Sequence, residues 1–437
     1  MEKLNKKPHP NPPHKGGNIK KMKRIYTILT CLLFLPLWGG QVGFLRADSP
    51  SFRGAWIATV ANIDWPTPEA VGNTSKQQSE MIFLLDSLQS IGINAIIFQV
   101  RPTADALYDS QLEPVSHWLT GKQGSWVNDQ LPDTNYQSPW DPLEWTIEQA
   151  HERNMEVHVW LNPYRVNLVT TDTSSLAPDH IMRQHPDWFW CYNKQWYFDP
   201  GLDVTREWIC TIVQDIVTRY PVQAVHMDDY FYPYPVGGKE LPDQETFLRY
   251  QNGFEDIRDW RRNNVNMAIQ AISETIHECR SDVEFGISPF GVWRNASVDS
   301  TGSATQAGIT NYDDLYADIR LWIQNGWIDY VLPQLYWEIG KRVADYEILA
   351  HWWANEVRGT NCKLYIGMAP YRLQDTQTTK TTKTTQTNPW QEGNEISRQM
   401  RLNRTIPEIT GECFYSTRPL LRNPRNVCDS IRNFYKK

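Results

Sequence analysis

The sequence lacks several patterns that mark common classes of protein. None of its seven cysteines belongs to a C-x-x-C pair, so a zinc ribbon and a thioredoxin-type redox site are excluded. The first strand-like segment, RGAWIATV at 53–60, is not followed by a glycine-rich phosphate loop, which disfavours a nucleotide-binding sheet. The same segment has no histidine, although metal-dependent barrel hydrolases usually take histidine ligands from their first strand. No internal repeat and no second domain is recognisable.

Positive charge is scarce outside the N-terminal segment. Residues 1–47 carry nine of the 43 basic side chains and only one of the 50 acidic ones, so that the rest of the chain has a net charge of −15. A partner with many phosphate groups, such as nucleic acid or an anionic membrane surface, requires the opposite sign of charge. We therefore expect no nucleic-acid partner, and we expect a neutral or weakly charged ligand.

Long hydrophobic runs are also missing. The longest apolar stretch, Ile25–Leu37, spans only 13 residues, too few to cross a bilayer comfortably. A basic pair precedes it and Ala47 follows it, as in a secretory signal peptide. We expect an N-terminal extension and signal peptide over 1–47, with the true start at Met22 and the signal over Met22–Ala47. The protein would then be periplasmic or extracellular, without stable membrane insertion after cleavage; an uncleaved N-terminal anchor is the alternative.

Aromatic side chains, in contrast, are abundant. Twenty Trp, twenty Tyr and fourteen Phe make up 12% of the chain. Aromatic rings carry much of the burial in protein cores, and their flat apolar faces also stack on the C–H faces of sugar rings. So many rings indicate a carbohydrate ligand in addition to an ordinary core.

Strand-like and helix-like segments alternate along residues 48–437, which we treat as one domain. The expected strands are Arg53–Thr59, Asn94–Arg101, Glu156–Arg165, Ala224–Tyr232, Glu284–Gly291, Asp329–Glu338, Lys363–Arg372 and Glu412–Thr417. The expected helices are Lys76–Ser90, Pro142–Asn154, Thr205–Tyr220, Glu255–Arg280, Tyr312–Asn325, Val343–Glu356, Glu395–Asn403 and Asn426–Tyr435. Eight such units predict an α/β fold, the (β/α)8 or TIM barrel, with long loops at its C-terminal face. A doubly wound sheet is the alternative.

In several expected strands, polar residues occupy every second position and therefore share one face of the strand. Because side chains alternate along a strand, His226 and Asp228 share the face opposite to Val225 and Met227. The same alternation in three other strands predicts that Gln99, Arg101, His158, Trp160, Asn162, Gln334, Tyr336 and Glu338 also point inward. Polar groups inside a barrel are costly unless they bond to each other or to a ligand. They therefore indicate a polar pit at the carboxyl ends of the strands, where barrel enzymes have their sites.

This pit has the residues that glycosidic-bond cleavage requires. The reaction uses two carboxyl groups, one protonated and one acting as nucleophile or base. Asp228 is the first candidate and Glu338 the second, whereas Asp229 faces away from the axis unless the strand ends before it. The candidates for substrate binding are Arg101, His158, Trp160, Asn162, His226, Tyr230, Gln334, Tyr336 and Trp293. The two histidines would bond sugar hydroxyls or tune the carboxylates, and Arg101 would keep a carboxylate ionised.

Six segments resemble one known family. They are FRGAWIATVANIDWP at 52–66, FQVRPTADALY at 98–108, WLNPYRVN at 160–167, HMDDYFYP at 226–233, YDDLYADIRLWIQNGWIDYVLPQLYW at 312–337 and FYSTRPL at 414–420. Together they resemble the glycosyl-hydrolase-like 10 group of exported bacterial proteins. The resemblance implies a (β/α)8 barrel with glycosidase activity, and it implies peptide-free peptidoglycan strands as one substrate within the family. It supports Asp228 or Asp229 as catalytic, with Asp64, Asp313, Asp314 and Asp318 as alternative acids.

Three functions stay open at this point. The first is a glycosidase that acts on a cell-wall or other polysaccharide, without a metal or cofactor. The second is a non-catalytic glycan-binding barrel, in which the carboxylates only accept hydrogen bonds. The third is a metal-dependent hydrolase with His158, His226 and Asp228 as ligands. Replacement of Asp228 by Asn separates the first two, because only an enzyme would lose turnover while it keeps binding.

Overall fold

A computed structural model describes residues 51–124, 140–168, 170–374 and 389–436. The expected N-terminal extension and signal peptide, 1–47, lie outside the described residues. Within the described ranges, no helix combines the length and the apolar character that a membrane span needs. The six cysteines in these ranges are free thiols.

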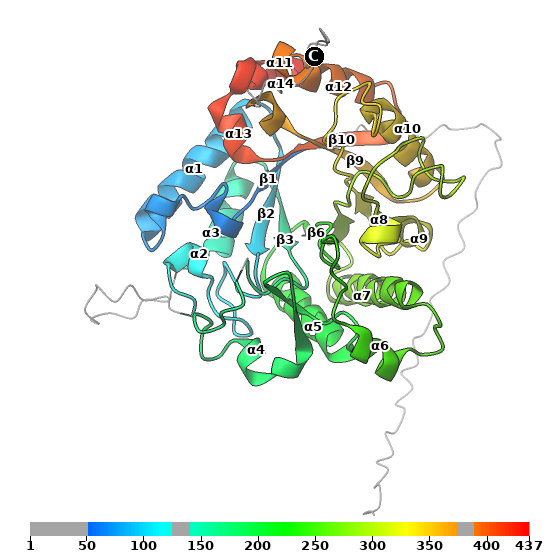
Figure 1. Cartoon of the computed structure of the whole chain (residues 1–437). Coiled ribbons are helices and arrows are strands. Elements are labelled where there is room, and N and C mark those ends of the chain that lie inside the picture. The colour runs from blue at the N-terminus through cyan, green and yellow to red at the C-terminus, as the bar shows by residue number, and fades with distance from the viewer. Residues whose placement is uncertain (1–50, 125–139, 169, 375–388, 437) are drawn as a thin grey trace, which may run out of the picture. The chain divides into compact units, whose positions relative to one another are not determined.

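Eight parallel strands close into a barrel (Figure 1). They are β1 Phe52–Ile57, β2 Ala95–Arg101, β3 Glu156–Leu161, β6 Ala224–Met227, β7 Glu284–Ile287, β8 Tyr330–Val331, β9 Lys363–Met368 and β10 Ile409–Phe414. Around the barrel the order is β1-β10-β9-β8-β7-β6-β3-β2. Each barrel strand therefore pairs with the barrel strands before and after it in the sequence, and β1 pairs with both β2 and β10 to close the ring. The expected (β/α)8 barrel is confirmed.

Helices surround the strands, as Figure 1 shows. The longer ones are α1 Thr74–Ser90, α3 Pro142–Glu152, α5 Asp203–Arg219, α7 Ile257–Cys279, α10 Tyr346–Val357, α12 Glu395–Asn403 and α14 Val427–Tyr435. The shorter ones are α2 His117–Thr120, α4 Ile181–Gln184, α6 Gln244–Tyr250, α8 Asn311–Asp314, α9 Ile319–Gln324, α11 Pro389–Glu392 and α13 Thr417–Arg422. Asp141, Asp256 and Asp345 cap α3, α7 and α10, because their carboxylates accept the first free backbone N–H groups.

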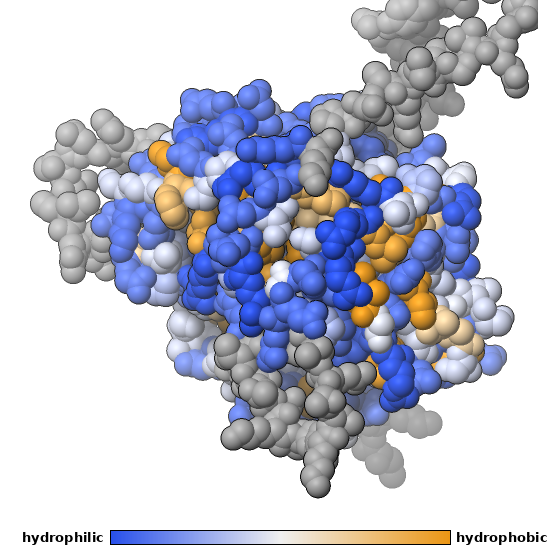
Figure 2. Space-filling view, turned by 90° about the horizontal axis from the view of Figure 1, so that it is seen from above, coloured by the Kyte–Doolittle hydropathy of each residue, from blue (hydrophilic) through white to orange (hydrophobic). Residues whose placement is uncertain are grey.

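The core has two layers, as the alternation along the strands predicts. Between strands and helices lies a large apolar layer that includes Val157, Val159, Val225 and Met227. Inside the barrel lies a smaller cluster of Phe52, Trp56, Ala58, Ala95, Ile97, Trp160, Ala224, Tyr330, Leu332, Tyr365 and Cys413. Outside, the face seen in Figure 2 is mostly hydrophilic, with its hydrophobic residues in separate patches. The barrel interior is therefore filled at its base, and only its rim can hold a ligand.

Several strands are shorter than the sequence predicts, β6 and β8 most of all, and the structure adds a hairpin that the sequence does not predict. Strand β6 ends at Met227 instead of Tyr232, and β8 covers only Tyr330–Val331. The hairpin consists of β4 Phe189–Tyr192 and β5 Gln195–Phe198. It pairs with the segment after β3 through an antiparallel bridge between Arg165 and Tyr197, and so positions that segment at the rim. Alternation no longer decides the direction of side chains beyond these early strand ends.

Candidate active site

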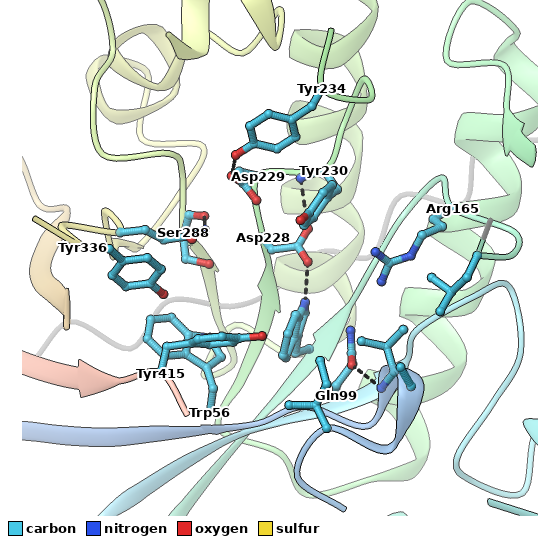
Figure 3. Close-up of a pocket in the computed structure, with 16 residues that line it drawn as sticks. Trp56, Gln99, Arg165, Asp228, Asp229, Tyr230, Tyr234, Ser288, Tyr336 and Tyr415 are labelled. Atoms are coloured by element: carbon cyan, nitrogen blue, oxygen red, sulfur yellow. Dashed lines mark hydrogen bonds between the residues drawn. The ribbon is translucent and has the colours of Figure 1, made fainter. Parts of the chain in front are cut away.

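A cavity of about 400 Å³ opens at the carboxyl ends of the strands. Its size falls within the range of small-ligand sites, roughly 300–1,000 Å³. The lining residues come from the ends of β1, β2, β3, β6, β7, β8 and β10 or from the segments that follow them. They are Trp56, Val60, Ala61, Ile63, Gln99, Trp160, Arg165, Leu168, Asp228, Asp229, Tyr230, Tyr234, Ser288, Gln334, Tyr336 and Tyr415 (Figure 3).

Asp228 lines this cavity and accepts three hydrogen bonds. Trp160 Nε1 donates to Oδ2 over 3.0 Å, and the Tyr230 backbone N–H donates to Oδ1 over 3.1 Å. A longer bond of 3.4 Å comes from Asn162 Nδ2. Burial raises the pKa of Asp228, whereas the nearby charge of Arg165 and these donors act in the opposite direction. The surroundings thus provide a carboxylate with fixed donors.

Asp229 faces the same cavity. Because β6 has ended at Met227, the next two residues are not held to opposite faces of a strand, and both carboxyl groups turn to the rim. The Tyr234 hydroxyl donates to Asp229 Oδ2 (Figure 3). Burial, and then the charge of Asp228, raise the pKa of Asp229 to about 7. The two acids interact, so they titrate as a pair in which one proton is held near neutral pH.

Aromatic rings form much of the remaining wall. The rings of Tyr336 and Tyr415 lie 6.0 Å apart and nearly parallel, and Trp56 meets Tyr415 edge to face at 5.9 Å. Tyr230 and Tyr234 lie 5.6 Å apart on the side of the two acids. Rings of this kind around a pair of carboxyl groups suit a sugar ring, which has apolar faces and a polar edge.

A chain of hydrogen bonds runs from the cavity down into the barrel. Ser288 Oγ lies 2.9 Å from His226 Nε2, and the Tyr330 hydroxyl lies 2.9 Å from both His226 Nδ1 and His158 Nδ1. Because Trp56 Nε1 can only donate and lies 3.4 Å from His226 Nε2, this nitrogen accepts and His226 Nδ1 carries the proton. Burial lowers the pKa of His226 far below its usual range, so its imidazole stays neutral. This series of hydrogen bonds ends at Glu156, whose Oε2 lies 3.4 Å from His158 Nε2.

His158 and His226 therefore lie below the cavity and do not line it, contrary to their expected contact with substrate. They do not come together with Asp228 as a ligand set either. Among the residues that the structure describes, no three His, Cys, Asp or Glu side chains are grouped so that they could hold a metal ion.

Glu338 does not reach the cavity. It follows β8 by seven residues, accepts from Trp390 Nε1 over 3.0 Å and forms an ion pair with Lys341 at 3.0 Å. The expected inward orientation assumed a strand that continues to residue 338, and this strand ends at Val331. Among the described residues that line the cavity, Asp228 and Asp229 are the only acids.

Arg101, Asn162 and Trp293 also lie outside the lining. Arg101 forms a buried ion pair with Glu113, and its Nη1 donates to the backbone oxygen of Asn162 over 2.6 Å. Asn162 in turn contacts Asp228, so both residues position the acid instead of binding a ligand. Trp293 packs behind the rim, where its Nε1 lies 3.3 Å from Asp318.

Of the predicted site residues, the structure brings six to the cavity: Trp160, Asp228, Asp229, Tyr230, Gln334 and Tyr336. The polar and aromatic lining residues that the prediction missed are Trp56, Gln99, Arg165, Tyr234, Ser288 and Tyr415. Gln99 lies in the predicted inward phase of its strand, although it is not among the predicted binding residues. Trp56, Arg165 and Tyr415 lie within segments that carry the family resemblance, which was the available signal.

Comparisons with known proteins identify the family of this chain. Residues 51–385 match the model of the family described as glycosyl hydrolase-like 10. The chain belongs to this family. It is 46% identical over 380 residues to the glycosyl hydrolase YngK of Bacillus subtilis, covering 87% of this chain and 70% of that relative. It is 39% identical over 388 residues to the glycosyl hydrolase DigH of Escherichia coli K12, covering 85% of this chain and 84% of that relative.

Solved structures share the fold of this glycosyl hydrolase-like 10 member. The PgaB (BpsB) glycoside hydrolase domain from Bordetella bronchiseptica superposes with a TM-score of 0.54 at 11% identity, covering 88% of this chain and 99% of that domain. Family membership and the barrel together support a glycosidase-like function. The cavity itself holds two buried carboxyl groups in different environments, surrounded by aromatic rings.

Proposed function

We propose that the protein is a glycosidase that hydrolyses O-glycosidic bonds of a polysaccharide, with Asp228 and Asp229 as its two carboxyl groups. The observation that carries this proposal is their position side by side in one cavity lined by aromatic rings. Glycosidic-bond cleavage uses one carboxyl group that holds a proton and one that is ionised. Glu338, the partner expected from the sequence, is replaced in this role by Asp229.

The environments of the two acids support a different role for each. Asp229 has a pKa raised to about 7, so it holds a proton near neutral pH and would donate it to the departing glycosidic oxygen. Burial raises the pKa of Asp228 too, but three N–H donors and the nearby Arg165 charge oppose this rise and favour its ionised form. Asp228 would attack the anomeric carbon or activate a water molecule. The surrounding tyrosines and tryptophans would hold the sugar ring over the pair.

The proposed substrate is a cell-wall or other polysaccharide, and peptide-free peptidoglycan strands are the first candidate. The family resemblance supports this choice. The signal-like segment Met22–Ala47 supports export to the periplasm or the cell exterior, where such strands occur. We propose a polysaccharide as the only partner class, with no nucleic acid, because the chain after residue 47 has a net charge of −15.

The test is incubation with a panel of purified glycans that includes peptide-free peptidoglycan strands, with products measured by mass spectrometry. Wild type and the control variant Asp187→Asn, which alters an exposed aspartate outside the cavity, should release the same fragments. Asp228→Asn and Asp229→Asn should lose turnover and still bind strands in a pull-down. Unchanged behaviour of both Asn variants, with binding but no products in any sample, would instead establish a glycan-binding barrel without catalysis.

A further inference from the structure

Arg165 is a buried cation that faces the proposed active site. It follows β3, has only 8% of its surface exposed and lines the cavity beside Asp228 (Figure 3). Three contacts fix its orientation. Its backbone N–H donates to Asn162 Oδ1 over 3.0 Å, its Nε donates to the Pro102 oxygen over 3.2 Å, and its guanidinium lies over the Tyr230 ring at 5.3 Å.

The two terminal nitrogens of Arg165 are left without a protein acceptor. Within the part of the chain that the structure describes, neither Nη atom forms a hydrogen bond, and no carboxylate lies within ion-pair distance of the guanidinium. The charge of Arg165 acts on Asp228 only through space. Buried arginines are almost always paired, because the loss of hydration is costly. A largely buried guanidinium at a cavity, held in place but with two terminal nitrogens that have no protein acceptor among the described residues, therefore points to a ligand anion.

A second donor on the same side of the cavity also lacks an acceptor. Gln99 Oε1 accepts from the backbone N–H groups of Thr59 and Val60 over 3.0 and 2.9 Å, which fixes the orientation of the amide. Its Nε2 is buried and has no partner among the described residues. In the view of Figure 3, Gln99 and Arg165 lie on one side of Asp228, and Ser288 and Tyr336 lie on the other. Two residues that have donors without a protein acceptor in the described part of the chain thus lie on one side of Asp228.

We propose that Arg165 binds a carboxylate of the substrate, so that the cavity selects glycans whose sugar units carry a carboxyl group. This inference rests on the proposed function and adds the chemical class of the substrate. The planar guanidinium offers two parallel N–H groups that match the two oxygens of a carboxylate, whereas a hydroxyl oxygen matches only one of them. The carboxylate can belong to a lactyl ether, as in muramic acid, or to C6 of a uronic acid.

The proposal differs from the neutral ligand that the overall charge predicts. The net charge of −15 is spread over a large surface, and salt screens its contribution within about 10 Å. Arg165 lies within the cavity, where the charge of a side chain acts over a few ångströms and with little screening. The local cation therefore decides the charge of the ligand, and the surface charge does not.

The test uses two pairs of substrates that differ only in their carboxyl groups. One pair is peptide-free peptidoglycan strands and the same strands after carbodiimide activation and borohydride reduction, which turns each carboxylate into an alcohol. The other is a polyuronate and its carboxyl-reduced form. For each pair, the ratio of kcat/KM for the acidic over the reduced form is measured with full-length wild type, Arg165→Gln, Arg165→Lys and the control Arg258→Gln. The side chain of Arg258 is 65% exposed and does not line the cavity, so its replacement removes one positive charge outside the site.

Wild type and Arg258→Gln should prefer the acidic form of at least one pair by about tenfold or more, as expected for a charge-assisted hydrogen bond. Arg165→Gln should lower this ratio to about one, and Arg165→Lys should keep part of it. The ratio compares two substrates within one sample, so it does not depend on how much of a variant is folded. The pair that shows the preference identifies the source of the carboxylate.

A wild-type ratio near one for both pairs would overturn the carboxylate proposal and leave the glycosidase proposal intact. A wild-type preference that persists in Arg165→Gln would overturn it as well. If wild type cleaves none of the four substrates, the ratio of dissociation constants, measured by tryptophan fluorescence with the same proteins, replaces the kinetic ratio. Carboxylate recognition then stands or falls on this binding ratio, while the glycosidase proposal fails separately.

Discussion

Trp160 Nε1 donates a hydrogen bond to Asp228 Oδ2 over 3.0 Å, from the strand next to the one that precedes the acid. In the register of β3 and β6, Trp160 pairs with His226, two residues before Asp228. The indole therefore reaches past its strand partner to the rim. Since a buried carboxylate keeps its charge only where donors compensate it, this register determines how Asp228 is held.

Replacement of Trp160 by Phe tests this bond, because it keeps an aromatic ring in the wall and removes the N–H donor. A hydrogen bond to a charged group is worth about 1.5–3 kcal/mol, so kcat should fall by roughly tenfold to a hundredfold. The control Trp352→Phe removes an indole donor that binds the Thr301 oxygen outside the cavity, and it should leave kcat unchanged. If Trp160→Phe keeps the kcat of wild type, the hydrogen bond from Trp160 to Asp228 does not contribute to catalysis.

The rate should depend on pH through Asp229. Its pKa is raised to about 7, and the proposed acid acts only when protonated, so kcat/KM should fall as pH rises through about 7. The hydrogen bond from Tyr234 stabilises the ionised form and lowers this pKa. Tyr234→Phe should therefore move the alkaline limb of the pH profile to higher pH. The control Tyr250→Phe, which alters a ring that is 40% exposed, should leave the alkaline limb where it is in wild type. An alkaline limb that does not move in Tyr234→Phe would exclude Asp229 as the acid.

Glu412 on β10 should make the stability of the fold depend on pH. Burial raises its pKa from 4.5 to about 7, with the Tyr435 hydroxyl 3.2 Å away. A raised folded-state pKa favours folding when the group is protonated, and this contribution is lost as pH rises from about 4.5 through about 7. Relative to wild type, Glu412→Gln should gain up to about 3 kcal/mol of unfolding free energy between about pH 4 and about pH 8.

Urea unfolding at several pH values measures this gain. The control Glu278→Gln alters an exposed glutamate on α7 and should give the same difference from wild type at every pH. A difference between wild type and Glu412→Gln that does not vary with pH would show that folding does not raise the pKa of Glu412.

The buried Arg101–Glu113 pair should be important for stability. Arg101 Nη2 lies 2.5 Å from Glu113 Oε1, both side chains are fully buried, and Trp208 Nε1 also donates to the same glutamate over 3.3 Å. Arg101→Met leaves Glu113 buried without its partner and should cost about 3–5 kcal/mol in urea unfolding. The double variant with Glu113→Leu should recover most of this loss, because it removes the unpaired charge. Failure of the double variant to recover would place the cost in the lost bonds to the Asn162 and Pro163 oxygens.

The sequence predicted the barrel because the signals for it are local. Alternation of Val157 and Val159 with His158 and Trp160 depends only on the two-residue period of a strand, and the structure places the two sets on opposite faces. The same rule placed Trp160 and Asp228 inward. It failed for Glu338, because β8 ends at Val331 and the chain then turns Glu338 towards Lys341 and Trp390.

By itself, the sequence determined the alternation of strands and helices, the closed eight-stranded barrel, the family, and the inward position of Asp228 at the rim. Only the tertiary structure decided that Asp229, and not Glu338, shares the cavity, and that Arg165 faces it with its terminal nitrogens unpaired. The physical reason is that a strand ends where its neighbours stop pairing with it. Where a strand ends, and which distant segments meet at the rim, both depend on the whole barrel. Neither leaves a local pattern in the residues.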